Sequence, residues 1–145
     1  MESQASKNAF VDEMTKVNRK LRTLFDARVR EHGLTLARAR LLLHLAKNEG
    51  ATQTELAAAL EVEQPSMVTL IDALERKGLV LRREVEGDRR AKRIFLTEAA
   101  RREADTLLEF ANDLRAQVLV GIGGEDLEVA TRVLRQVARN IGAAS

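Results

Sequence analysis

One stretch of the chain, residues 62–97, constrains the fold more than any other. It begins with apolar residues spaced three and four apart, which predicts an amphipathic helix, and Gly78 is the expected stop of that helix. Residues 79–85 predict a short strand, residues 86–88 a turn, and residues 93–96 the partner strand. The stretch thus predicts a helix followed by two strands, with arginine and lysine concentrated around the turn between the strands.

A second helix is expected immediately before this stretch. Thr52 and Glu55 have the spacing of a capping box, which predicts a helix over residues 52–60. A short connection leads to the helix of residues 64–77, where Pro65 is tolerated in the first turn. This is helix-turn-helix spacing, with the second helix in the recognition position. Together with the two strands it predicts a winged helix-turn-helix, a unit that holds DNA.

Long amphipathic helices are predicted at both ends of the chain. Apolar residues recur at helical spacing over residues 10–29, 107–119 and 127–141. On the first of these helices, Arg22 and Asp26 are four residues apart, which allows them to pair as a weak surface contribution. The small middle unit cannot cover all of these apolar stripes, so we expect a homodimer in which the end helices pair with their equivalents. A monomeric bundle is the alternative.

The predicted fold class is mainly α with a β wing of two to three strands. Residues 1–145 are expected to form a single chain built from two lobes. Residues 35–97 are the expected winged helix-turn-helix DNA-binding lobe, and residues 8–33 and 98–142 the expected helical dimerisation lobe.

Composition excludes several classes of protein. Apolar residues make up 45% and charged residues 32% of the chain, which is typical of a globular domain. No apolar run approaches the ~20 residues of a membrane span, and the first residues do not resemble an export signal, so we expect a cytoplasmic protein without membrane contact. The chain has no cysteine, and His32 and His44 are its two histidines. No catalytic triad, metal-ligand spacing or glycine-rich phosphate loop emerges, so we expect neither an enzyme nor a cofactor or metal.

Positive charge is local rather than global. The formal net charge is only +2, yet residues 82–93 hold six basic and three acidic residues. The expected recognition helix has no basic residue before Arg76, so phosphate contacts are assigned to the turn. Short polar side chains near the helix start are the candidates for reading base edges. The candidates are Gln64, Ser66 and Thr69 for bases, and Arg89, Arg90, Lys92 and Arg93 for phosphates.

Three motifs resemble a known family. Residues 88–97 (DRRAKRIFLT) resemble the wing signature of MarR-type winged-helix transcriptional regulators, and residues 63–68 and 74–80 resemble the recognition helix of that family and its exit. Together they are similar to the SlyA-like subgroup. The resemblance implies a homodimer that binds palindromic promoter DNA, usually as a repressor, with recognition helices in major grooves and wings in minor grooves.

The resemblance also implies roles for individual residues. Gln64, Pro65, Ser66 and Thr69 match major-groove positions, although relatives often have a basic residue at the position of Thr69. At the wing, Arg89 or Arg90 matches the tip arginine, Asp88 would orient the wing by pairing with one of them, and Lys92 adds charge.

Many members of this family are released from DNA by a small anionic aromatic ligand. An aromatic acid or its coenzyme A thioester is the expected effector class, and Arg22, Arg38 and His44 are the candidate effector-binding residues. The alternative for the two arginines is a solvated helix face with salt bridges. The alternative for His44 is a core histidine whose hydrogen bonds are satisfied within the protein.

Two functions therefore follow from the sequence. The first is a sequence-specific, ligand-responsive transcriptional regulator of double-stranded DNA. The alternative is a nonspecific architectural nucleic-acid-binding protein that uses the charge of the wing without reading sequence.

Overall fold

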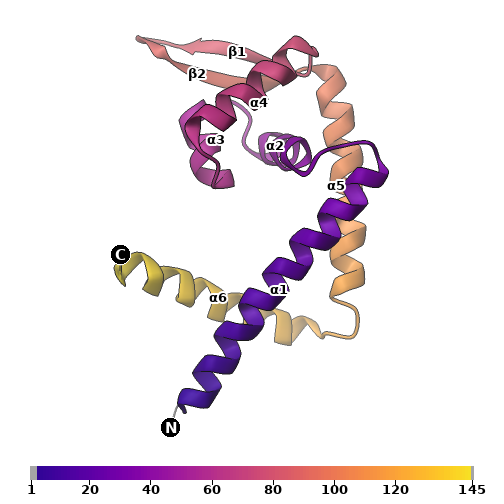
Figure 1. Cartoon of the computed structure of the whole chain (residues 1–145), viewed down its shortest axis with the longest axis vertical. Helices are drawn as coiled ribbons and strands as arrows, with labels where there is room; N and C mark the ends of the chain where they lie inside the picture. The colour runs from indigo at the N-terminus through magenta and orange to yellow at the C-terminus, as the bar shows by residue number, and fades with distance from the viewer. Residues whose placement is uncertain (1–2, 145) are drawn as a thin grey trace. The chain divides into compact units, whose positions relative to one another are not determined.

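The computed structural model describes residues 3–144, apart from the side chains of residues 88–90. Within this range the chain forms six helices and two strands (Figure 1). In chain order they are α1 (Gln4–Glu31), α2 (Leu36–Lys47), α3 (Gln53–Leu60), α4 (Gln64–Arg76), β1 (Val80–Val85), β2 (Asp88–Leu96), α5 (Glu98–Val118) and α6 (Gly124–Ala144). No described helix combines the length and apolar character needed to cross a membrane.

The chain forms two compact units, Met1–Ala111 and Asn112–Ser145. The first unit contains α1 to α4, both strands and the first part of α5, and the second contains the end of α5 and all of α6. Val29 of α1 and Leu107 of α5 belong to the same buried cluster as the helix-turn-helix, because both helices pack on that lobe. The division into a DNA-binding lobe and a dimerisation lobe at residues 35–97 remains a prediction.

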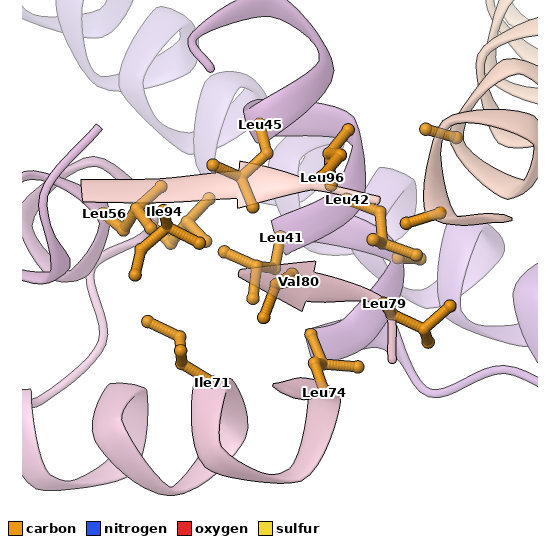
Figure 2. Close-up of a cluster of buried hydrophobic side chains, with 14 of the residues drawn as sticks. Leu41, Leu42, Leu45, Leu56, Ile71, Leu74, Leu79, Val80, Ile94 and Leu96 are labelled. Atoms are coloured by element: carbon orange, nitrogen blue, oxygen red, sulfur yellow. The ribbon is translucent and has the colours of Figure 1, made fainter. Parts of the chain in front are cut away.

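The core of the first unit is built on α2. Leu41, Leu42 and Leu45 are completely buried, and Figure 2 shows them facing side chains of α4 and of both strands. The other side chains labelled in this cluster are Leu56, Ile71, Leu74, Leu79, Val80, Ile94 and Leu96. Each fully buried side chain of this size contributes about 1.5–3 kcal/mol relative to an exposed one. The lobe that carries the recognition helix is therefore rigidly packed.

Local sequence signals fix the helix-turn-helix. The Thr52 side chain accepts a hydrogen bond from the Glu55 backbone N–H at 3.1 Å, and the Glu55 carboxylate accepts one from the Thr52 N–H at 3.3 Å, so the predicted capping box is present. Glu61 follows α3 in the left-handed conformation, with φ of 54°. Pro65 lies in the first turn of α4, as predicted.

The strands form an antiparallel ribbon that pairs Val80 with Leu96 at its base, and we call this ribbon with its turn the wing. The second strand is longer than the predicted residues 93–96, since β2 begins at Asp88. The predicted turn of residues 86–88 is correspondingly too long. The turn reduces to residues 86–87, because Gly87 adopts φ of +84°. Strand pairing continues toward the tip, where Lys92 and Glu84 form an ion pair at 3.0 Å.

The predicted fold class is confirmed. A two-stranded sheet forms the wing, and an isolated bridge between Thr52 and Arg93 joins it to the residue that caps α3. Thr97 caps α5, since its hydroxyl accepts a hydrogen bond from the Ala100 N–H at 3.3 Å and donates one to the Gly78 carbonyl at 2.7 Å.

One predicted ion pair was wrong. Asp26 pairs with Arg30 at 3.1 Å rather than with Arg22. The observed order has the acid one turn before the base, which is the favoured orientation on a helix because it also suits the helix dipole.

The capping box yields a stability prediction with a matched control. Replacing Thr52 with Ala removes the side-chain acceptor at the start of α3, so the free energy of unfolding should fall by about 1 kcal/mol. Thr54 is exposed on the same helix and caps nothing, so Thr54→Ala should change it by less than about 0.5 kcal/mol. Urea denaturation measures both, and an equal loss for the two variants would contradict the role of the cap.

Candidate nucleic-acid interface

Helix α4 has one buried and one exposed face. Met67, Ile71 and Leu74 are buried in the core. The exposed face carries the residues predicted to meet DNA, which are Gln64, Pro65, Ser66 and Thr69. Helical periodicity places Pro65, Ser66 and Thr69 away from the buried side, whereas Gln64, three residues before Met67, is exposed as the first residue of the helix. All four predicted major-groove residues are thus exposed to solvent.

The start of α4 keeps hydrogen-bonding capacity for a partner. Glu63 occupies the N-cap position but its side chain forms no capping hydrogen bond, so N–H groups of the first turn stay open. Thr69 donates its hydroxyl to the Pro65 carbonyl at 3.0 Å, whereas the side chains of Gln64 and Ser66 have no partner among the described residues. Gln64 and Ser66 are therefore the freer of the candidates for contacts with base edges or phosphates.

Two cations of the wing are engaged within the protein. Lys92 is paired with Glu84, and Arg93 donates from Nη1 to the Gly50 carbonyl at 2.9 Å. The side chains of the remaining predicted wing residues, Asp88, Arg89 and Arg90, lie outside the described residues. Their backbone forms the beginning of β2, next to the turn at Gly87, so they are carried at the tip of the ribbon.

Arg82 makes the densest polar network near α4, a role that its place in the basic stretch of residues 82–93 did not predict. Its Nε donates to the Gln53 side-chain oxygen at 2.8 Å, its Nη1 to Glu75 at 3.0 Å, and its Nη2 lies 2.6 Å from an oxygen of Asp72. An arginine in the first strand and an acid pair one turn apart on the preceding helix are visible in the sequence. Which strand face meets the helix is not, because it depends on register.

The three predicted effector residues are not gathered at one site. Arg22 is exposed on α1, Arg38 lies near the beginning of α2, and His44 is half-buried near the end of α2. Arg38 is bound to Glu103 of α5 through two hydrogen bonds of 2.7 and 2.8 Å. Its Nε is buried and has no hydrogen-bond partner, so the guanidinium keeps one unused donor.

A pocket of about 220 Å³ lies beside this ion pair, within the first compact unit. It is lined by His32, Leu34, Glu103, Thr106, Leu107 and Phe110. The Phe110 ring contacts the rings of His32 and Phe25, at centroid distances of 5.2 and 5.9 Å. None of the three predicted effector residues lines this pocket, but Arg38 is bound to Glu103, which does. The pocket combines α5 residues with the segment between α1 and α2, so sequence spacing alone could not assemble it.

Within the described residues, no group of three or more histidine, aspartate or glutamate side chains could hold a metal ion. The first unit carries an exposed polar face on α4, and α4 lies beside the wing, whose sequence near the turn includes Arg89 and Arg90. These features define a winged helix-turn-helix protein.

Comparison with known proteins agrees. The MarR family profile matches residues 32–91. The crystal structure of transcriptional regulator PA3341 is 36% identical and covers 92% of this chain and 98% of its own, with a TM-score of 0.84. The chain therefore belongs to the MarR family of transcriptional regulators, as its motifs indicated.

More distant structures share the fold. The S. aureus MepR–DNA complex is 20% identical, with a TM-score of 0.76, and the match covers 91% of this chain and 97% of MepR. S. aureus MarR in complex with salicylate and kanamycin is 17% identical, with a TM-score of 0.83 and coverage of 98% and 96%. The regulator SlyA is 20% identical, with a TM-score of 0.79 and coverage of 93% and 95%.

The ion pair beside the pocket yields a prediction. Arg38 and Glu103 are mostly buried, with side chains 22% and 23% exposed, so a double-mutant cycle with Arg38→Met and Glu103→Gln should give a coupling energy of about 1–2 kcal/mol in urea denaturation. The control is the pair of Lys16 and Glu13, whose side chains are 49% and 63% exposed, with an expected coupling below about 0.5 kcal/mol. Equal coupling in both cycles would contradict a structural role for the Arg38 pair.

Proposed function

We propose that this protein is a homodimeric, sequence-specific transcriptional repressor of the cytoplasm that binds palindromic promoter DNA and has no enzymatic activity. The observation that carries the proposal is the exposed polar face of α4 on a well-packed lobe, next to a wing whose sequence carries Arg89, Arg90 and Lys92. Affinity for DNA comes from phosphate contacts and selectivity from base-edge contacts. In this division Gln64, Pro65, Ser66 and Thr69 meet the major groove, while Asp88, Arg89, Arg90 and Lys92 form the wing contacts.

The end helices support the homodimer. None of the 21 residues of α6 is buried within the single chain. Large apolar side chains are exposed on α1 and α6, among them Val17, Leu134 and Ile141, the last of which is 61% exposed. Apolar stripes of this extent on monomeric proteins are rare, and a second copy of the chain offers the same stripes for pairing.

Competition binding tests sequence reading directly. The wild-type protein should bind a site that it selects from a random duplex pool about 10³-fold or more tightly than random DNA. Ser66→Ala should lower affinity for the selected site by about 1–2 kcal/mol and leave affinity for random DNA unchanged, because a base-edge contact is lost. Fluorescence anisotropy measures both affinities. A wild-type protein with equal affinity for all duplexes is instead the nonspecific architectural protein.

The wing residues should dominate the salt dependence. Replacing Arg89 and Arg90 with Ala should reduce the magnitude of the negative slope of log affinity against log salt by about 1–2, since each phosphate contact contributes about −0.9. The matched control replaces Arg19 and Lys20, two exposed cations on α1, with Ala and should leave the slope unchanged. An unchanged slope in the wing variant argues against the role of the two arginines.

A small anionic aromatic effector is the second part of the proposal. Phe110 offers an aromatic contact in the pocket, and Glu103, which also lines it, is paired with Arg38. A ligand carboxylate would compete with Glu103 for Arg38. The S. aureus MarR structure with salicylate supports this class of ligand.

Thermal shift tests this effector class. Salicylate, benzoate and an aromatic coenzyme A thioester should raise the melting temperature of the wild-type protein, because a ligand that binds only the folded state stabilises it. The shift should be lost in Arg38→Met but kept in Arg22→Ala, since Arg38 holds the pocket residue Glu103 in an ion pair, whereas Arg22 is exposed on α1. Equal shifts in both variants would place the ligand elsewhere.

A further inference from the structure

Arg82 connects the wing to both helices of the helix-turn-helix with one side chain. From β1 its guanidinium reaches Gln53 of α3 and both Asp72 and Glu75 of α4, at 2.8, 2.6 and 3.0 Å. The Arg82 side chain is only 18% exposed, so this network lies at the junction of the three elements. A guanidinium is planar and presents its donors at fixed angles, so three partners hold it in one orientation.

The next residue of the strand does nothing similar. Successive side chains of a strand point to opposite faces, and the Arg83 guanidinium lies over the Phe95 ring, 4.8 Å from its centroid. Arg83 is exposed and forms no ion pair with α4 among the described residues. Comparing variants of these two neighbouring arginines can therefore distinguish the effect of the contacts with α4 from the effect of positive charge on β1.

The charges in the network bear on DNA binding. Asp72 and Glu75 lie on the recognition helix, and their side chains are 45% and 42% exposed. Carboxylates on such a helix repel the phosphate backbone unless a cation stands beside them. Arg82 provides this cation. It also holds the base of the ribbon, so a small rotation there would move the residues near the turn at Gly87 furthest.

We propose that Arg82 is a positioning residue that sets the wing relative to α4 and thereby determines how well the protein discriminates its own site from other DNA. The inference rests on the proposed function. A two-part contact selects a site only when the helix and the wing fit their grooves together. Arg82 is placed to set that spacing without touching DNA, through Gln53, Asp72 and Glu75.

Lysine separates geometry from charge. Arg82→Lys keeps the positive charge beside Asp72 and Glu75 but offers a single ammonium in place of the planar fork. It should bind random duplex DNA with unchanged affinity and salt slope, and should lower the ratio of selected-site to random affinity about tenfold, the scale of one mismatched base pair. The control Arg83→Lys, on the opposite face of the same strand, should leave both the ratio and the slope unchanged.

Removing the charge gives the complementary test. Arg82→Met should lower the ratio as well and should also weaken binding to random DNA, because the two carboxylates lose their cation. Adding Asp72→Asn and Glu75→Gln to this variant should restore binding to random DNA but not the ratio. Restoration of both would overturn the positioning role, since charge alone would then explain the effect.

The selected site comes from the wild-type protein and a random duplex pool, and anisotropy gives each affinity, with thermal unfolding as the check on folding. If the wild type binds the selected site more tightly than random DNA, and Arg82→Lys has the same ratio of the two affinities, this inference alone is overturned. A wild type that discriminates no DNA overturns the proposed function and this inference with it. A parallel loss of stability and of both affinities in Arg82→Lys also overturns the inference, because Arg82 would then only support the fold.

Discussion

Burial of one face of α2 is the interaction on which the DNA-binding lobe depends. Leu41, Leu42 and Leu45 are fully buried, and α2 packs against α1, α3 and β2. Because the recognition helix and the wing are held by this shared core, their side chains can be positioned without large internal motion. A cavity at any of these leucines would loosen every element that carries the interface, at a cost of about 2–5 kcal/mol for a change to alanine.

Charge is distributed so that the two halves of the interface have different tasks. The recognition helix carries Asp72 and Glu75 and follows Glu61 and Glu63, so it adds little electrostatic attraction to DNA. Positive charge is concentrated around the wing tip instead. In the proposed function, α4 therefore contributes mainly base contacts, while the wing supplies attraction that does not depend on sequence. Arg82 connects the wing to the recognition helix, since it forms ion pairs with Asp72 and Glu75 of α4.

Local features of this fold were predictable from sequence because their signals are local. The capping box at Thr52, Pro65 in the first turn of α4 and the cap at Thr97 all depend on residues within one turn of each other. The start of β2 was predicted too late. The charged residues near the turn belong to the strand because they pair with β1, and this pairing cannot be predicted from their local sequence. Cross-strand partners such as Glu84 and Lys92 become visible only once register is known.

The polar contacts that position the site were beyond local reasoning. Arg38 and Glu103 are 65 residues apart, and Arg82 and Gln53 are 29 apart, so no periodicity relates them. The exposed face of α4 was predictable in part, because helical spacing separates Ser66 and Thr69 from Met67 and Ile71, whereas Gln64 is exposed as the first residue of the helix. The pocket at Phe110 and the network of contacts around Arg82 could be identified only from the tertiary structure.

Methylation protection of the selected DNA site tests most directly whether α4 reads bases while the wing holds the flanks. The guanine N7 atom lies in the major groove and the adenine N3 atom in the minor groove, so dimethyl sulfate reports the two grooves separately. We predict protected N7 atoms in two symmetric half-sites about one helical turn apart, with protected N3 atoms on both flanks. Protection confined to the minor groove, or spread without two-fold symmetry, would contradict base reading by α4.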